Sequence, residues 1–215
     1  MYLNTVIYDI IPFLELFIKA DPKNLDEVEE ALAKKNRGYD FVLYAAVVLQ
    51  YYSLWIFFHA VQEANISNWD LAGRIVSMGL LCGAFGINVA HELGHRVNKF
   101  EQFLAKMLLL TSLYMHFFIE HNKGHHKHVA TASDPSTAKY NQSLYAFWPQ
   151  TLMGTYMSAW KIATEELEKK GKSWFSINNE MLLFQLIQVA FVLGIYLIFG
   201  LSVALFFLIS LGTTV

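Results

Sequence analysis

Residues 41–61 read FVLYAAVVLQYYSLWIFFHAV and contain no Asp, Glu, Lys or Arg over 21 positions. A helix that crosses a bilayer needs roughly 20 predominantly apolar residues. Residues 181–199 have the same character, residues 201–211 resume it, and residues 71–90 form a further candidate span. Charged residues make up only 16% of the chain, against about 25% in soluble proteins. The sequence therefore predicts an all-α fold, a polytopic transmembrane helical bundle.

Basic residues gather on one side of these predicted spans. Fifteen of the sixteen Lys and Arg residues lie at 19–37, 96–139 and 161–172. The loop at 63–69 and the turn around Gly200 contain neither. Because cytoplasmic loops carry an excess of Lys and Arg, we expect a multi-pass protein of the inner (plasma) membrane with these two loops outside. The net charge of −2 and the lack of a basic stripe give no indication of nucleic-acid binding.

Seven of the eight histidines fall between residues 91 and 128, on the side predicted to be cytoplasmic. They include the motifs HELGH at 91–95 and HNKGHH at 121–126. Histidines four residues apart lie about 40° apart around a helix, so each motif can direct two imidazoles at one metal ion. The next residue lies roughly 100° further round and could reach a second ion. The predicted ligands of a two-metal site are His91, His95, His121, His125 and His126.

The apolar segment at 103–119 separates the two histidine motifs. As one helix it would extend about 26 Å, nearly enough to cross the hydrocarbon core. Crossing would leave the motifs on opposite membrane faces. We therefore predict that the segment lies as an interfacial helix along the cytoplasmic face, or dips into the membrane and returns. The alternative is that it spans the membrane and only one motif binds metal.

HELGH also fits the H-E-x-x-H pattern of zinc proteases, in which Glu92 would act as the general base. Intramembrane proteases of this kind need a further aspartate ligand within another span. The predicted spans contain no Asp after Asp40. This alternative also leaves the second histidine motif without a role, so a two-metal site accounts for more of the sequence.

Four stretches together resemble the integral-membrane alkane hydroxylases (alkane 1-monooxygenases), which belong to the histidine-box family of membrane di-iron desaturases and hydroxylases. They are HELGHR at 91–96, EHNKGHHKHVAT at 120–131, DPSTAKY at 134–140 and SLYAFWPQT at 143–151. The resemblance implies two non-haem iron ions held by the five histidines named above, with His128 outside the ligand set. It also implies hydroxylation of the terminal carbon of n-alkanes with O2, an alkane substrate taken from the lipid bilayer, and electrons from a rubredoxin-type donor.

The chain departs from that family where further histidine boxes, of the types NYxEHYG and HxxHH, would follow Val215. We accordingly expect residues 1–215 to be a single membrane-embedded hydroxylase domain, incomplete at its carboxyl end and short at its amino end. Such a chain should not hydroxylate alkanes alone, because metal binding depends on ligand number. A xylene-type or fatty-acyl hydroxylase or desaturase is the alternative within the same family.

Several further residues receive weaker predictions. Glu92 and Glu120 adjoin ligands and are candidates for orienting imidazole N–H groups, or are simply solvated helix ends. Asp134, followed by proline, is equally well explained as a turn former. His59 and His116 lie in apolar segments and are expected to be packed rather than metal-bound. Residues 51–58 could line a hydrocarbon channel or face lipid.

Overall fold

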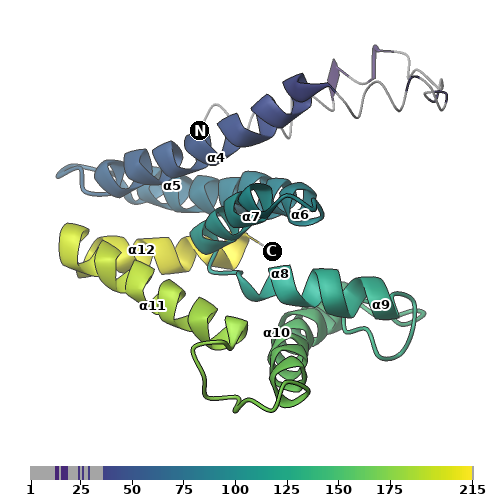
Figure 1. The fold of residues 1–215 in the computed structure, drawn as a ribbon. Helices are drawn as coiled ribbons and strands as arrows, with labels where there is room; N and C mark the ends of the chain where they lie inside the picture. Colours follow the sequence, from purple (N-terminus) through teal and green to yellow (C-terminus); the bar gives the residue numbers. More distant parts are fainter. Residues whose placement is uncertain are drawn as a thin grey trace.

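The computed structural model describes residues 36–214, together with residues 13, 14, 16–18, 24, 26 and 29. From the sequence we also predict a short or incomplete membrane helix within 1–19 and a charged, solvated helix at 24–35, and both lie largely outside the described residues. Within the described part every regular element is helical, which confirms the all-α prediction. Figure 1 shows these helices packed as a bundle, with the amino-terminal α4 on one side and α10 and α11 on the other.

Three helical stretches are long and apolar enough to cross a membrane. They are α4 (Arg37–Ala60), the continuous stretch Asn68–Gly94, and α11 (Glu180–Phe199). The stretch Asn68–Gly94 consists of α5 (Asn68–Leu81), a π-helical segment (Cys82–Ile87) and α6 (Asn88–Gly94). A shorter apolar helix, α12 (Leu201–Ser210), follows α11. The predicted spans are thus confirmed as helices, and the chain is a membrane protein.

The ends of these helices are determined by local side chains. Asn36, Ser67 and Asn179 cap α4, α5 and α11 by accepting hydrogen bonds from the first free backbone N–H groups. Gly200 separates α11 from α12 with φ of 92°, a backbone conformation that only glycine adopts without strain. This single residue reverses the chain, so α11 and α12 pack as a hairpin (Figure 1).

The segment at 103–119 is not the continuous helix that the sequence suggested. α7 (Lys99–Thr111) ends, Leu113 takes φ of 50°, and α8 begins at His116 and ends at Glu120. The backbone N–H of Tyr114 closes the break by donating to the carbonyl of Leu109 at 2.9 Å. The chain therefore turns back, as the dip-and-return prediction required, and α7 packs against α6.

Two hydrophobic clusters form the interior. One joins α4, α5, α11 and α12 around Leu54, Met78 and Phe207. The other joins α4, α6, α7, α8, α10 and α11 and includes Leu93, Leu108 and Phe184. Leu93, within the first histidine motif, and Ile119, two residues before the second, both belong to this second cluster, so both motifs are anchored in the packed interior.

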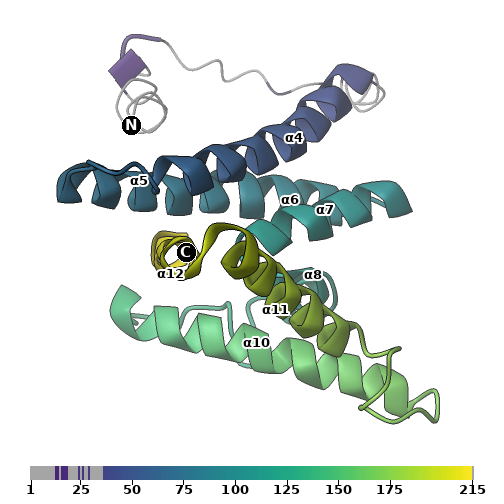
Figure 2. The ribbon, with the colours of Figure 1, turned by 90° about the vertical axis from the view of Figure 1, so that its left-hand side faces the viewer.

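The short loops lie opposite the histidine motifs. Figure 1 shows the α4–α5 loop and the α11–α12 turn at one end of the bundle, and α9 (His126–His128) at the other. This arrangement agrees with the expectation that both loops share one membrane side. Figure 2 shows α10 (Leu144–Glu168) as an outer layer beside α8, with α11 above it.

Gly79 allows α5 to approach the end of α12 closely. A Cβ at this position would lie 1.9 Å from Thr213 Oγ1 and 2.0 Å from the carbonyl oxygen of Ser210. Gly73, on the same helix, has nothing within 4 Å of the corresponding point. The close contact between the two helices therefore depends on Gly79.

We expect Gly79→Ala to destabilise the protein by about 1–3 kcal/mol, because overpacking would force the helices apart. Gly73→Ala is the matched control and should stabilise by up to about 1 kcal/mol, since alanine favours a helix over glycine. Thermal unfolding in detergent measures both. Equal effects of the two substitutions would show that the helices do not meet at Gly79.

Candidate metal centre

Four histidine side chains converge at the end of the bundle opposite the short loops. Nε2 of His95 lies 2.9 Å from Nε2 of His91 and 3.1 Å from Nε2 of His121. Nε2 of His126 lies 3.1 Å from Nε2 of His121. One nitrogen from each of the four lies within 4.8 Å of the others. The chain turn at Leu113 is what brings the second pair beside the first.

The spacing of these nitrogens fits a metal ion. Two ligands that bind one ion at right angles through bonds of about 2.1 Å have donor atoms about 3 Å apart. The three Nε2–Nε2 distances of 2.9–3.1 Å match that geometry. His91, His95 and His126 are exposed and His121 is half-buried, so one side of the group is open. The group could hold an ion and still admit other ligands.

His125 is not among the four, although an α-helix would place it above His121. The backbone N–H of His126 bonds to the carbonyl of His121, five residues earlier, because residues 121–125 form a π-helical turn. The wider turn rotates His126 over His121 and moves His125 aside. The ring of His125 nevertheless stays close, with its centroid 5.3 Å from that of His121 and 5.7 Å from that of His126.

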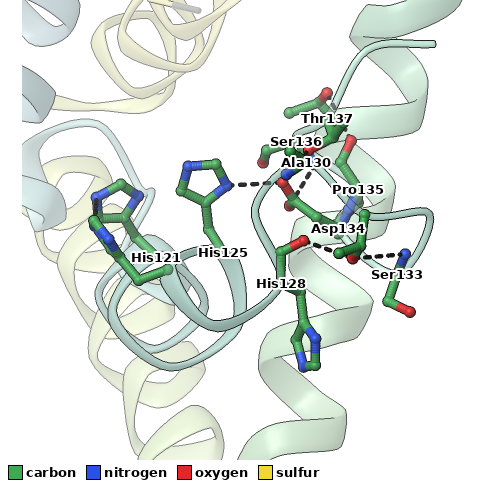
Figure 3. A network of polar contacts seen from close by, with 12 residues as sticks. His121, His125, His128, Ala130, Ser133, Asp134, Pro135, Ser136 and Thr137 are labelled. Carbon is green, nitrogen blue, oxygen red and sulfur yellow. Dashed lines mark hydrogen bonds and ion pairs between the residues drawn. The ribbon is translucent and has the colours of Figure 1, made fainter.

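His125 is held by Asp134, as Figure 3 shows. Nδ1 of His125 lies 3.0 Å from Oδ2 of Asp134. That carboxylate also accepts hydrogen bonds from the hydroxyl of Thr137 at 2.5 Å and the backbone N–H of Ser136 at 2.9 Å. Burial acts to raise the pKa of Asp134, but these hydrogen bonds outweigh it and the pKa lies below its usual value. An ionised Asp134 keeps the proton of His125 on Nδ1 and leaves Nε2 free to bind metal.

Asp134 is thus the functional residue that sequence reasoning undervalued. It was explained as a turn former, and its bond to Ser136 does form that turn, but its other oxygen orients an imidazole. The two acidic residues chosen instead behave differently. Glu92 is exposed and lies 3.6 Å from Arg96, whereas Glu120 is buried at 2% exposure. Burial and the nearby charge of Asp134 raise the pKa of Glu120 to about 6.

Burial and the neighbouring histidines keep the imidazole of His121 neutral. Burial, followed by repulsion from the surrounding histidines, lowers the pKa of His121 to about 3. The same two causes lower the pKa of His95. Neutral imidazole is the form that binds metal. Both residues are therefore ready to act as ligands at neutral pH.

The end of α6 is fixed by Arg96, which follows His95. Its guanidinium donates to Asp40 on α4 and to Glu101 on α7, the latter at 2.8 Å. Glu101 is buried and also accepts from the hydroxyl of Tyr44 at 2.8 Å. This network joins α4, α7 and the end of α6 beside His95. It therefore restricts the movement of the His95 side chain.

The remaining histidines lie apart from the group, as expected. His59 packs against Trp55 and Phe199, with ring centroids 4.7 and 5.6 Å away. His116 is buried between Tyr114 and Tyr156. His128 extends away from His125 in Figure 3. None of the three belongs to the four-histidine group found among the described residues.

Comparison with known proteins places this arrangement in a family. Residues 67–215 match the model of the fatty acid desaturase family. The chain belongs to the fatty acid desaturase family. The predicted resemblance to alkane hydroxylases is confirmed as well. The chain is 36% identical over 212 residues to alkane 1-monooxygenase 2 of Pseudomonas aeruginosa, covering 95% of this chain and 55% of that protein.

Two further relatives extend the comparison. Alkane 1-monooxygenase 1 of Alcanivorax borkumensis is 32% identical over 193 residues, which cover 90% of this chain and 48% of that protein. The xylene/toluene monooxygenase hydroxylase component of Pseudomonas putida is 31% identical over 111 residues, covering 52% and 30% respectively. The chain spans about half the length of the curated alkane monooxygenases that it matches. Family membership and the convergence of both histidine motifs on one group are evidence against the zinc protease alternative, which uses HELGH alone.

We expect Asp134→Asn to weaken metal binding by the complete family member about 10–100-fold, the usual effect of losing a carboxylate that orients a ligand. Glu92→Gln is the control, because Glu92 adjoins a ligand but contacts Arg96 instead. Metal retained per chain after dialysis against a graded chelator measures both. A greater loss with Glu92→Gln would show that the wrong carboxylate has been identified.

Proposed function

We propose that this chain is part of a non-haem di-iron monooxygenase that hydroxylates the terminal carbon of n-alkanes with O2. The observation that supports it most directly is the group of four imidazoles with mutual nitrogen distances that fit a metal ion. The names of its relatives supply the reaction class. The proposal concerns the complete protein.

We propose that the metal is iron and that two ions are bound. His91, His95, His121 and His126 would surround one ion, and Nε2 of His125 would serve the second. Additional ligands from the complete protein would approach on the exposed side of the group. When bound, the two irons would supply the redox chemistry that activates O2. The task of the chain is to present neutral imidazoles and to hold them in place through Asp134 and Arg96.

A cavity beside Phe117 lies close to the histidines. This cavity of about 390 Å³ is lined by Ile87, Tyr114, Phe117 and residues of α5 and the π-helical segment, together with the polar residues Asn88, Thr213 and Thr214. The ring of Phe117 stacks on His121 with centroids 4.6 Å apart and lies 6.3 Å from His91. We propose this cavity as the end of the substrate path from the bilayer, in place of the aromatic residues 51–58. Phe117 would then exclude water from the reacting carbon.

A basic groove beside the site suits an acidic electron donor. It has a volume of about 1160 Å³ and is lined by the loop 127–140 and one face of α10. Its lining contains five lysines and three carboxylates, so positive charge is in excess. The lysines are Lys123, Lys127, Lys139, Lys161 and Lys169, and the carboxylates are Asp134, Glu165 and Glu166, the last paired with Lys123 at 2.8 Å. Asp134 lines the groove and bonds to His125. A donor bound in the groove would therefore be separated from the proposed ligand His125 only by Asp134. We propose a rubredoxin-type donor that docks on the cytoplasmic side of the inner membrane.

A xylene-type hydroxylase is the second candidate. The likeness to the xylene/toluene monooxygenase component favours it, but it covers only 52% of this chain. The alkane monooxygenases are similar over 90–95%. Because the similarity to the alkane monooxygenases covers more of the chain, it favours an alkane as the substrate.

The direct test is conversion of octane to 1-octanol by membranes that contain the complete protein, with a rubredoxin and its reductase supplied. We expect His121→Ala to abolish the product, since His121 is central to the histidine group and every neighbouring imidazole contacts it. His59→Gln, far from the group, should leave the rate unchanged. Undiminished octanol formation by the His121→Ala protein would refute the proposed site. Conversion of xylene but not octane would favour the second candidate.

We expect Lys127→Glu combined with Lys139→Glu to raise the KM for a rubredoxin several-fold at low salt with little change in kcat. Charge complementarity chiefly affects the encounter of two proteins and is screened by salt. Lys99→Glu is the matched control, because Lys99 lies outside the groove. Titration of the donor at two ionic strengths gives the result. If the double variant and the Lys99→Glu variant show the same change in KM, the groove is not the docking site.

A further inference from the structure

Three residues of α8 and the following turn, spaced four apart, face α10. The ring of His116 lies 5.4 Å from that of Tyr156. Glu120 interacts with Ser158, and a Cβ at Gly124 would lie 3.1 Å from Ile162 Cδ1. These contacts place one face of α8 and of the following turn against α10, and the two helices cross where they meet (Figures 1 and 2).

Two polar atoms in this interface are buried without a hydrogen-bond partner among the described residues. They are Nε2 of His116 and Oε1 of Glu120. His116 is 6% exposed and Glu120 is 2% exposed. Both belong to the one short helix α8, and residues four apart on a helix have Cβ atoms about 5–6 Å apart. The two unsatisfied atoms therefore belong to side chains one helical turn apart in the same interface.

Leaving such atoms unsatisfied is costly. A buried donor or acceptor without a partner loses its hydrogen bonds to water without compensation, and native structures contain few such groups. Buried water commonly satisfies neighbouring polar groups in a site that offers 2–4 partners. This interface offers an imidazole nitrogen, a carboxylate oxygen and the hydroxyl of Ser158, which interacts with Glu120.

We propose that His116 and Glu120 bind a buried water molecule between α8 and α10, and that this bridged pair positions the π-helical turn that carries the metal-binding histidines. Glu120 is the last residue of α8, and His121 begins the turn. Oε1 of Glu120 would lie 2.7 Å from a Cβ at Gly124, so this carboxylate packs directly on the turn. A Glu120 side chain held by water fixes that contact. His116 is thus a positioning residue that acts through Glu120.

The first test is a double-mutant cycle on the metal-free complete protein, read by thermal unfolding. His116→Phe and Glu120→Leu should each lower Tm, because each leaves the water and the other residue short of a partner. The double variant should lose clearly less than the sum, since removing both polar groups removes the need for water. His59→Phe combined with Glu120→Leu is the control pair and should be additive. Additivity in the first pair would overturn the proposal.

High-resolution cryo-electron microscopy provides the second test and does not require the variants to fold. We expect density at hydrogen-bonding distance from both Nε2 of His116 and Oε1 of Glu120. A direct hydrogen bond between the two side chains, without such density, would overturn the water site.

The positioning role rests on the proposed metal site and needs its own measurement. His116→Phe should lower the iron retained per chain several-fold and alter the Mössbauer signature of the iron that remains, whereas His59→Phe should change neither. Unchanged iron content and spectrum would overturn the positioning role. The unfolding cycle and the density concern the metal-free protein, so they stand even if the complete protein acts on another substrate.

Discussion

The reversal of the chain between α7 and α8 is the constraint on which the rest of the site depends. HELGH lies at the end of α6 and HNKGHH follows α8, with an apolar segment between them long enough to separate the two motifs by most of a membrane. Leu113 takes φ of 50°, and Tyr114 bonds back to Leu109. A branched side chain at positive φ is strained, so the surrounding packing must stabilise it. Leu113 contacts both hydrophobic clusters, which meet at this point.

Much of the fold could be predicted from composition alone, because a bilayer requires long apolar helices and leaves few alternatives. The runs at 41–61, 71–90 and 181–199 became helices with nearly the predicted limits. The reversal could be predicted only by a functional argument, namely that two histidine motifs must meet. Neither periodicity nor a glycine or proline marks residues 112–115 as a break. Tertiary packing determines that break, and a local pattern does not contain that information.

The site shows a different limit of sequence reasoning. The prediction that histidines four residues apart share a face is correct for His91 and His95, which lie at the end of a regular helix. The rings of His121 and His125 also lie together, stacked with centroids 5.3 Å apart, but a π-helical turn adds one residue and brings His126 into the group as well. Gly124 was a signal that could have been used. A glycine inside a histidine motif indicates a close approach of the backbone, and here the turn packs against Glu120 and Ile162.

The π-helical turn also explains why the acidic residue that holds His125 comes from elsewhere in the sequence. With His125 moved out of the four-histidine group, its ring is directed toward the loop that follows α9 (Figure 3). Asp134 in that loop uses one oxygen to form its own turn with Ser136 and the other to accept from His125. The carboxylates next to the ligands in sequence cannot do this, since Glu92 faces Arg96 and Glu120 faces α10. The π-helical turn therefore sets the direction of the His125 imidazole, and that direction determines that Asp134 is its hydrogen-bond partner.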